Sequence, residues 1–220
     1  MKEKIQKILL KPQNIFSKKS NSITAKEEIK QLRQENEKLK KSFEEQCIEK
    51  FKTRRSIRKF SNKQIDYKII HTIIESGLNA PCAGNIQNTK IIVVDNQETK
   101  YKAAQAALQQ YWISDAPYCL VIVRDDNEII NVYPEYGKTY SIQNTAALIE
   151  NIIMTTHFYN LGACWVECGD NNVLKSIFNV PPHLNIDAII PIGYPLENPT
   201  VKKIPTKNMV YFNSWDQKSK

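Results

Sequence analysis

The residues best suited to do chemistry are five consecutive positions, Arg54-Arg55-Ser56-Ile57-Arg58. A guanidinium group is planar, permanently charged and matched to phosphate oxygens, and a serine hydroxyl beside such groups adds a short neutral donor. We therefore predict that this segment binds a phosphate group, with Ile57 anchoring it inward. The segment alone leaves a solvated basic turn as the alternative.

A phosphate in this protein has to be held by side chains, because the glycine-rich alternatives are missing. The six glycines build neither a GxGxxG dinucleotide fingerprint nor a Walker loop. A Rossmann-type site and a P-loop are therefore disfavoured as the explanation of a phosphate site.

A second polar segment runs from Ala80 to Asn88, after a predicted helix and before a predicted strand. Its side chains Asn85 and Gln87 each offer a hydrogen-bond donor and an acceptor. Such amides match the alternating edge of a pyrimidine-like ring. The segment is thus predicted to present amide groups to a planar heterocycle.

Together the two segments resemble the FMN-dependent nitroreductase family, in which an R-x-S-x-R/K phosphate motif is followed by a P-S-x-x-N-x-Q-P-W loop. Further matches follow in the family's order, and the resemblance covers about residues 51–212. They are Asp115-Ala116-Pro117, the exit of a predicted long helix at Leu161 to Trp165, and Ile192 to Pro195. Several matches in order are far more specific than any one of them.

The resemblance implies an α+β fold, with a nitroreductase-like mixed sheet flanked by helices, in a domain-interlocked homodimer. It also implies FMN as cofactor and NAD(P)H as donor of hydride to flavin N5. A small organic acceptor, a nitroaromatic, quinone or related compound, then takes the electrons by a ping-pong mechanism. Because the flavin performs the chemistry, we expect no dedicated catalytic side chain. A dehalogenase or flavin-cleaving enzyme of the same superfamily stays open.

The resemblance also assigns residues to the phosphate end of the cofactor. Arg54 and Ser56 match the phosphate-binding residues, with Arg55 between them, and Lys203 stands where the family has a late phosphate-binding arginine. Arg58 matches the cation near flavin N1 and O2, where it would stabilise the anionic reduced flavin.

Two other segments correspond to the flavin ring. Val166 and Glu167 match the segment that crosses the flavin face, where a backbone N–H approaches N5. The loop around the pyrimidine edge, usually contributed by the second subunit, is represented by Pro81, Cys82, Asn85 and Gln87.

The chain departs from the family pattern at several positions, and we expect flavin affinity or substrate access to differ accordingly. Asn88-Thr89 replace the usual Pro-Trp, Asn144 stands where relatives often carry Asp, and Lys203 replaces a fork-shaped arginine with a point charge. Cys168 replaces a frequent glycine, and a packing role is favoured for it over a catalytic one.

Residues 1–50 are predicted to form a separate basic helical extension of the domain at 51–220. They hold thirteen lysines and arginines against eight glutamates, within a net charge of +8 for the chain. No Gly or Pro occurs from Ala25 to Lys50, and Ile29, Leu32, Asn36, Leu39, Phe43 and Gln46 follow heptad spacing. A polar a-site Asn favours a short two-stranded coiled coil.

Other roles for this extension stay open. They are a lone helix packed on the main domain, and an adaptor or membrane-surface tether that uses the flavin fold as a dimer platform. Nucleic-acid binding is disfavoured, because no aromatic-interleaved basic patch or reading motif accompanies the charge.

The domain at 51–220 reads as alternating helices and strands. Asp66 is predicted to cap a helix, and the long helix is expected to end before a left-handed Gly162. The remaining predictions are strands at Ile91–Val94, Cys119–Val123, Ala163–Glu167 and Asp187–Gly193, helices at Glu98–Gln110, Ser141–Tyr159 and Val173–Phe178, and an extended arm at Pro195–Lys220.

Two regions of this domain suggest contacts beyond the single chain. Aromatic residues of the arm, Tyr211, Phe212 and Trp215, need cover that a partner subunit can supply. The region Ile129–Tyr140 corresponds to a lid, whose tyrosines are candidates to stack on an aromatic substrate.

Five scattered cysteines without a repeating framework predict a reducing cytoplasm and no disulfide scaffold. The Cys164-x3-Cys168 spacing lacks a second cysteine pair, so no metal site is predicted. No apolar run reaches the roughly 20 residues of a spanning helix, and we predict no secretion signal.

Overall fold

The computed structural model describes residues 22–166 and 169–217. The chain divides into two compact units, residues 1–49 and 50–220, which are described separately below. The helix α2 (Ser22–Thr53) begins in the first unit and ends in the second. It includes the helix predicted at Ala25–Lys50. Among the described residues, no helix combines the length and apolar character needed to cross a bilayer.

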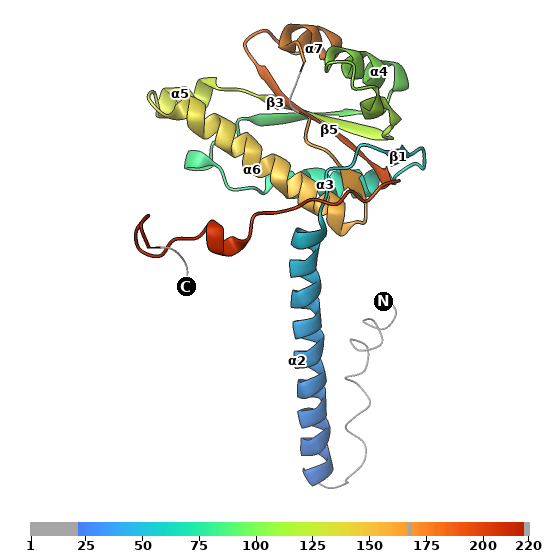
Figure 1. The fold of residues 1–220 in the computed structure, drawn as a ribbon, viewed down its shortest axis with the longest axis vertical. Coiled ribbons are helices and arrows are strands. Elements are labelled where there is room, and N and C mark those ends of the chain that lie inside the picture. The colour runs from blue at the N-terminus through green and yellow to red at the C-terminus, as the bar shows by residue number, and fades with distance from the viewer. Residues whose placement is uncertain (1–21, 167–168, 218–220) are drawn as a thin grey trace. The chain divides into compact units, whose positions relative to one another are not determined.

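The larger unit is built on a sheet of order β1-β5-β3-β2, with β4 also paired to β5 (Figure 1). All pairings between these strands are antiparallel. The long central strands are rich in β-branched residues, which suit a pleated surface buried on both faces. The strands are β1 (Phe60–Ser61), β2 (Thr89–Val94), β3 (Tyr118–Arg124), β4 (Gly162–Ala163) and β5 (Asn185–Pro195).

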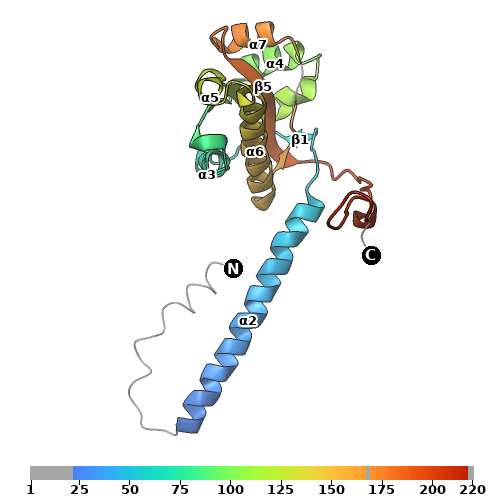
Figure 2. The same cartoon turned by 90° about the vertical axis from the view of Figure 1, so that its left-hand side faces the viewer.

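Helices cover both faces of this sheet, as Figures 1 and 2 show. Along β3, Leu120 and Ile122 belong to one buried cluster, and Val121 and Val123 belong to the other. The first cluster lies under α3 (Tyr67–Leu78) and α6 (Gly137–Phe158), and the second under α4 (Gln97–Ala106) and α7 (Asn171–Phe178). This alternation follows from the two-residue period of a strand. The predicted α+β fold with flanking helices is confirmed.

The helix α3 begins at the residue that the sequence predicts. The carboxylate of Asp66 accepts from the Lys68 N–H at 2.9 Å, so the predicted cap of α3 is confirmed. A short helix α5 (Asn127–Val132) precedes α6 in the predicted lid region. Single 3-10 turns lie at Ala83–Asn85 (η1), Tyr111–Asp115 (η2) and Thr206–Asn208 (η3).

Two predictions about helix ends were wrong. The left-handed residue after α6 is Asn160 (φ 58°), whose side chain tolerates this conformation. Gly162 instead lies in β4, where an added Cβ would come within 2.8 Å of Ile57. The helix expected to reach Gln110 ends at Ala106, before left-handed residues at 108 and 109.

The strand expected at Ala163–Glu167 is interrupted. β4 ends at Ala163, and pairing resumes as an isolated bridge between Val166 and Ile189. Glu167 and Cys168 lie outside the described residues.

In the C-terminal arm, the rings of Tyr211 and Trp215 stack with centroids 4.4 Å apart, and Trp215 remains 81% exposed.

Candidate functional site

The arginine–serine segment follows α2 directly and lies beside β4. Ser56 forms a parallel bridge with Ala163, and the Ile57 N–H donates to the Ala163 carbonyl at 3.0 Å. Ile57 is buried, as predicted, and packs where Gly162 leaves room. The side chains of the segment are therefore carried on a backbone fixed to the sheet.

The last turn of α2 is attached to the C-terminal end of α6. Lys50 Nζ donates to the His157 carbonyl at 3.2 Å and to Asn160 Oδ1 at 2.7 Å. Thr53 Oγ1 lies 3.2 Å from His157 Nε2. Burial, and then the charge of Lys50, lower the pKa of His157. A cation at a helix C-terminus interacts favourably with the terminal carbonyls, so this contact fixes where the arginine segment starts.

A pocket of about 280 Å³ gathers the predicted phosphate-binding residues. Its lining brings the early cations together with Lys203, from a distant part of the sequence, and contains no acidic side chain. Within the described part of the chain, the salt bridges involve neither Arg54, Arg58 nor Lys203. The side chains that line the pocket therefore carry a net positive charge. It is lined by Arg54, Arg55, Ser56, Arg58, Pro199, Val201 and Lys203.

Arg55 and Arg58 are held by different contacts. Arg55 donates to the carbonyls of Pro199 (3.1 Å), Lys52 (2.8 Å) and Arg54 (2.6 Å), which ties the segment to the C-terminal arm. The backbone N–H of Arg58 donates to Glu197 Oε1 at 2.5 Å. The guanidinium carbon of Arg58 lies 5.8 Å from the centroid of the Trp112 ring. Arg55 thus holds the arm at Pro199, which forms part of the pocket wall.

The segment after β4 lies next to these cations. Burial raises the pKa of the Cys164 thiol, against the opposing influence of Arg58, Ser56 and Arg54. The Val166 N–H donates to the Ile189 carbonyl at 3.1 Å, and the Ile189 N–H returns the bond at 2.9 Å. The backbone N–H of Val166 is therefore already used within the sheet.

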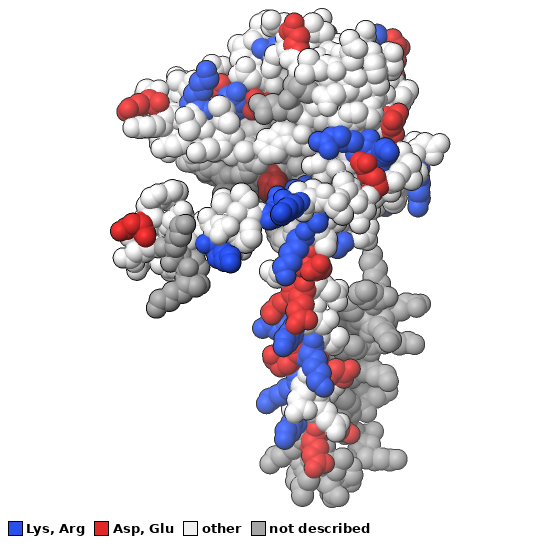
Figure 3. Space-filling model, in the orientation of Figure 1, with Lys and Arg blue, Asp and Glu red and all other residues white. Residues whose placement is uncertain are grey.

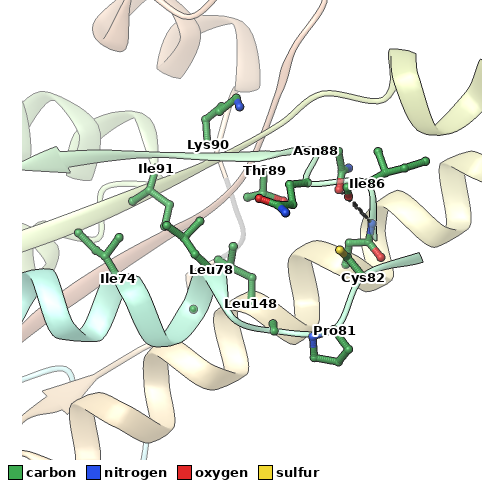
Figure 4. A pocket seen from close by; sticks show the side chains of 14 residues that line it. Ile74, Leu78, Pro81, Cys82, Ile86, Asn88, Thr89, Lys90, Ile91 and Leu148 are labelled. Atoms are coloured by element: carbon green, nitrogen blue, oxygen red, sulfur yellow. Dashed lines mark hydrogen bonds between the residues drawn. The ribbon is translucent and has the colours of Figure 1, made fainter. Parts of the chain in front are cut away.

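The second predicted segment lines a different pocket, of about 320 Å³ (Figure 4). Pro81, Cys82 and Gln87 line it, whereas Asn85 does not and is exposed with φ 56°. The two predicted sets of site residues thus lie in separate pockets of one chain. The apolar part of the lining is Ile74, Leu78, Ala80, Ile86, Ile91 and Leu148.

Comparison with known proteins identifies the family of the chain. Residues 51–117 and 106–194 match the Nitroreductase family. The chain belongs to the nitroreductase family. A relative named "Putative NADH dehydrogenase/NAD(P)H nitroreductase", from Methanothermobacter thermautotrophicus, is 27% identical over 172 residues, covering 76% of this chain and 87% of that protein.

Solved nitroreductase structures share the fold. A nitroreductase family protein from Clostridium novyi NT has 26% sequence identity and a TM-score of 0.64, covering 78% of this chain and 95% of its own. The "NADPH:FMN oxidoreductase from Vibrio harveyi complexed with NAD+" has 23% identity and a TM-score of 0.69, covering 77% of both chains. The nitroreductase-like fold predicted from the sequence is confirmed.

Two of the departures from the nitroreductase pattern, Asn88 and Asn144, contact each other, which sequence reasoning missed. Asn144 Nδ2 donates to Asn88 Oδ1 at 3.0 Å, while Asn144 Oδ1 accepts from the Ala83 N–H at 2.8 Å. Asn88 Nδ2 donates in turn to Ser141 Oγ at 2.5 Å, and all three side chains are buried. The signal available in the sequence was the joint replacement at positions 88 and 144.

This polar network extends to a buried ion-pair cluster. Ser141 Oγ donates to Asp126 Oδ1 at 2.5 Å. Arg124 pairs with both Asp126 and Asp187, and these carboxylates raise its pKa although burial, the largest influence, opposes them. The loop at 82–88 is therefore attached through α6 to the end of β3.

Aromatic side chains lie close to the same loop of this nitroreductase. The rings of Tyr133 and Tyr136 contact that of Tyr140, with centroids 5.3 and 6.0 Å away. A Cβ added to Gly84, which has φ 59°, would lie 2.8 Å from the Tyr133 hydroxyl. The predicted lid tyrosines are thus packed together against η1.

Proposed function

We propose that this protein is an FMN-dependent oxidoreductase that transfers hydride from NAD(P)H by way of flavin N5 to an organic acceptor. Family membership supports the reaction class. The similar Vibrio harveyi protein is named for NADPH and FMN. Bound FMN would supply the redox chemistry, and the chain's own residues would bind, orient and charge-stabilise it.

The cationic pocket is the observation that carries this proposal. A ribityl phosphate bears close to two negative charges at neutral pH, and Arg54, Ser56 and Lys203 present two cations and a hydroxyl donor in one pocket. Charge-assisted hydrogen bonds of this kind are about twice as strong as neutral ones. The residues fit the group in charge, donor type and number.

Arg58 is proposed to lie near flavin N1 and O2. Its backbone is held by Glu197 and its guanidinium lies over Trp112, so the side chain is positioned before any ligand binds. A preorganised cation stabilises negative charge that develops in the reduced ring. Because the Val166 N–H already donates to the Ile189 carbonyl, we propose that it is not the donor that faces N5.

A homodimer explains why the two sets of predicted residues lie in separate pockets. We infer that Pro81, Cys82, Asn85 and Gln87 of one subunit complete the site formed by the cationic pocket of the other. The arm supports this inference, because Phe212 and Trp215 are 55% and 81% exposed in the single chain. Large exposed aromatic side chains in a group indicate a binding partner.

The acceptor is proposed to be a flat conjugated ring, such as a nitroaromatic or a quinone. The tyrosine cluster at the lid supports this choice, because offset and edge-to-face ring contacts stabilise flat aromatic ligands. The cytoplasmic location and the membrane contact of residues 1–50 stay predictions.

The experiment is an anaerobic titration of the purified protein. We expect a yellow protein whose flavin absorbance bleaches on NAD(P)H addition and returns when a quinone is added. Steady-state rates with both substrates varied should give the parallel double-reciprocal plots of a ping-pong mechanism. A double variant Arg54→Ala, Arg58→Ala should lose the chromophore, whereas Lys68→Ala, an exposed cation on α3, should keep it. A colourless parent protein that does not bind added FMN would instead support the adaptor alternative.

A further inference from the structure

The helix α2 carries an exposed apolar seam in the smaller unit. Ile29, Leu32, Leu39 and Phe43 are 50, 58, 52 and 67% exposed. They follow the alternating three- and four-residue spacing of heptad positions a and d, with Asn36 at the central a position. Four such residues along one helix face would bury their apolar area against a matching helix.

The charges that flank the seam are sorted by sign. Glu28 and Glu35 occupy successive g positions, whereas Arg33 and Lys40 occupy successive e positions. All four side chains are exposed, and Figure 3 shows red and blue side chains interspersed along this helix. This sorting distinguishes between the ways in which two copies of the helix can pair.

Parallel pairing matches opposite charges. In a parallel coiled coil, a g residue lies beside the e residue of the partner's next heptad. Glu28 would then lie beside Arg33 of the partner subunit, and Glu35 beside Lys40 of the partner subunit. Antiparallel pairing places g beside g and e beside e, so glutamate would face glutamate and cation would face cation. The charge pattern therefore selects the parallel arrangement.

Asn36 selects the register. A single polar a-site residue specifies register and oligomer state at some cost in stability. With the helices in register, the two Asn36 amides can hydrogen-bond each other. A shift by one heptad would bury each Asn36 against an apolar Ile29 or Phe43, leaving its amide without a partner, which costs about 1–3 kcal/mol per unsatisfied group.

We propose that residues 27–49 of α2 bind the same segment of a second copy as a parallel, in-register, two-stranded coiled coil. The occupant of the exposed seam is thus this chain itself. The inference rests on α2 alone and does not depend on flavin chemistry. Three heptads make a short coil, and any other contact between the same two copies would raise its effective concentration.

Cysteine cross-linking of the full-length protein tests the arrangement. In a Cys47→Ser background, Ile29→Cys and Phe43→Cys are prepared separately, oxidised at low concentration and run on a non-reducing gel. Residues at equal a positions face each other in a parallel pair, so both variants should form disulfide-linked dimers. Both should react about tenfold faster than Gln34→Cys, on the outer f position, because only the seam holds two thiols at high effective concentration.

Other arrangements give other outcomes. The two seam positions are 14 residues apart, or about 21 Å along a helix at ~1.5 Å per residue. An antiparallel pair brings at most one of them close to its own copy. Cross-linking at one position alone, or at the outer position equally fast, would overturn the proposal.

A charge exchange tests the pairing independently. One chain carries Glu28→Lys with Glu35→Lys and the other carries Arg33→Glu with Lys40→Glu, each with the Phe43→Cys reporter. Expressed alone, each chain should cross-link several-fold less than its parent, because every flanking pair becomes repulsive. Co-expressed, they should give mixed dimers well above the random half. A random mixture would contradict the parallel charge pairing.

Discussion

The substitution Asn144→Asp offers a direct test of the buried network that holds the loop at 82–88. The Asn144 amide is 7% exposed and donates to Asn88 Oδ1 at 3.0 Å and to the Ile86 carbonyl at 3.4 Å. A carboxylate has almost the same shape and can still accept from the Ala83 N–H. It cannot donate, so two oxygens that now accept from an amide would face another oxygen.

The expected loss follows from the lost donors. A buried acceptor left without a donor costs about 1–3 kcal/mol, and the longer contact to Ile86 contributes less than the one to Asn88. We therefore expect a loss of about 2–3 kcal/mol, which corresponds to roughly 4–12 °C in melting temperature for a domain of this size. The burial of a charge also predicts a pH dependence.

The sign of this dependence can be stated. Burial raises the pKa of the introduced carboxyl above its unfolded value, so the folded variant binds more protons and its stability relative to the parent increases as pH falls. Urea unfolding of parent and variant at two pH values measures both effects. Asn151→Asp is the matched control, because Asn151 lies on the same helix, donates to the Ser76 carbonyl at 3.0 Å and is only part-buried. Equal losses in the two variants would refute the assigned network.

Three further outcomes are expected. Gly162→Ala should lower the free energy of unfolding by about 1–3 kcal/mol by overpacking against Ile57, and it should weaken FMN binding. Urea unfolding measures the first effect and a fluorescence titration the second. Unchanged values would show that the contact with β4 does not position the arginine–serine segment. His157→Gln should weaken the pH dependence of the free energy of unfolding below about pH 6.5. In the parent, the lowered pKa of His157 makes the folded state bind fewer protons than the unfolded state, so stability is lost as pH falls. Identical pH profiles of parent and variant in urea unfolding would contradict this. Lys203→Arg should tighten FMN binding and Lys203→Ala should weaken it, each by a few-fold, since the arginine fork can bind phosphate in two places; equal dissociation constants would exclude Lys203 from the site.

Local sequence signals predicted much of the secondary structure. Asp66 was recognisable as a cap because its side chain competes for backbone N–H groups, and the strand at Cys119–Val123 because β-branched residues cluster there. The end of α6 was predicted within one residue, but the left-handed residue that follows it was assigned wrongly, since Gly162 and Asn160 both suit that conformation. The choice between them depends on the contact of Gly162 with Ile57, which lies more than a hundred residues away in the sequence.

The candidate site could be predicted only in part, because the family motif identifies residues and not their grouping. The pattern named Arg54, Ser56 and Lys203, and the structure places them around one pocket. It marked Asn88 and Asn144 as departures from the family pattern but did not pair them, although the structure does. Pairings between distant buried polar groups depend on how α6 packs, and no local propensity encodes that.

The relative affinity for FMN and riboflavin tests the central claim most directly, because the two flavins differ only in the phosphate. Equilibrium titration of the apoprotein gives the ratio of the two dissociation constants for the parent and for Arg54→Ala. We expect the parent to prefer FMN strongly, and the variant to lose about tenfold or more of that preference while its riboflavin affinity stays the same, since a charge-assisted hydrogen bond contributes about 1.5–3 kcal/mol. An undiminished preference in the variant would contradict the assignment of the arginine–serine pocket to the cofactor phosphate.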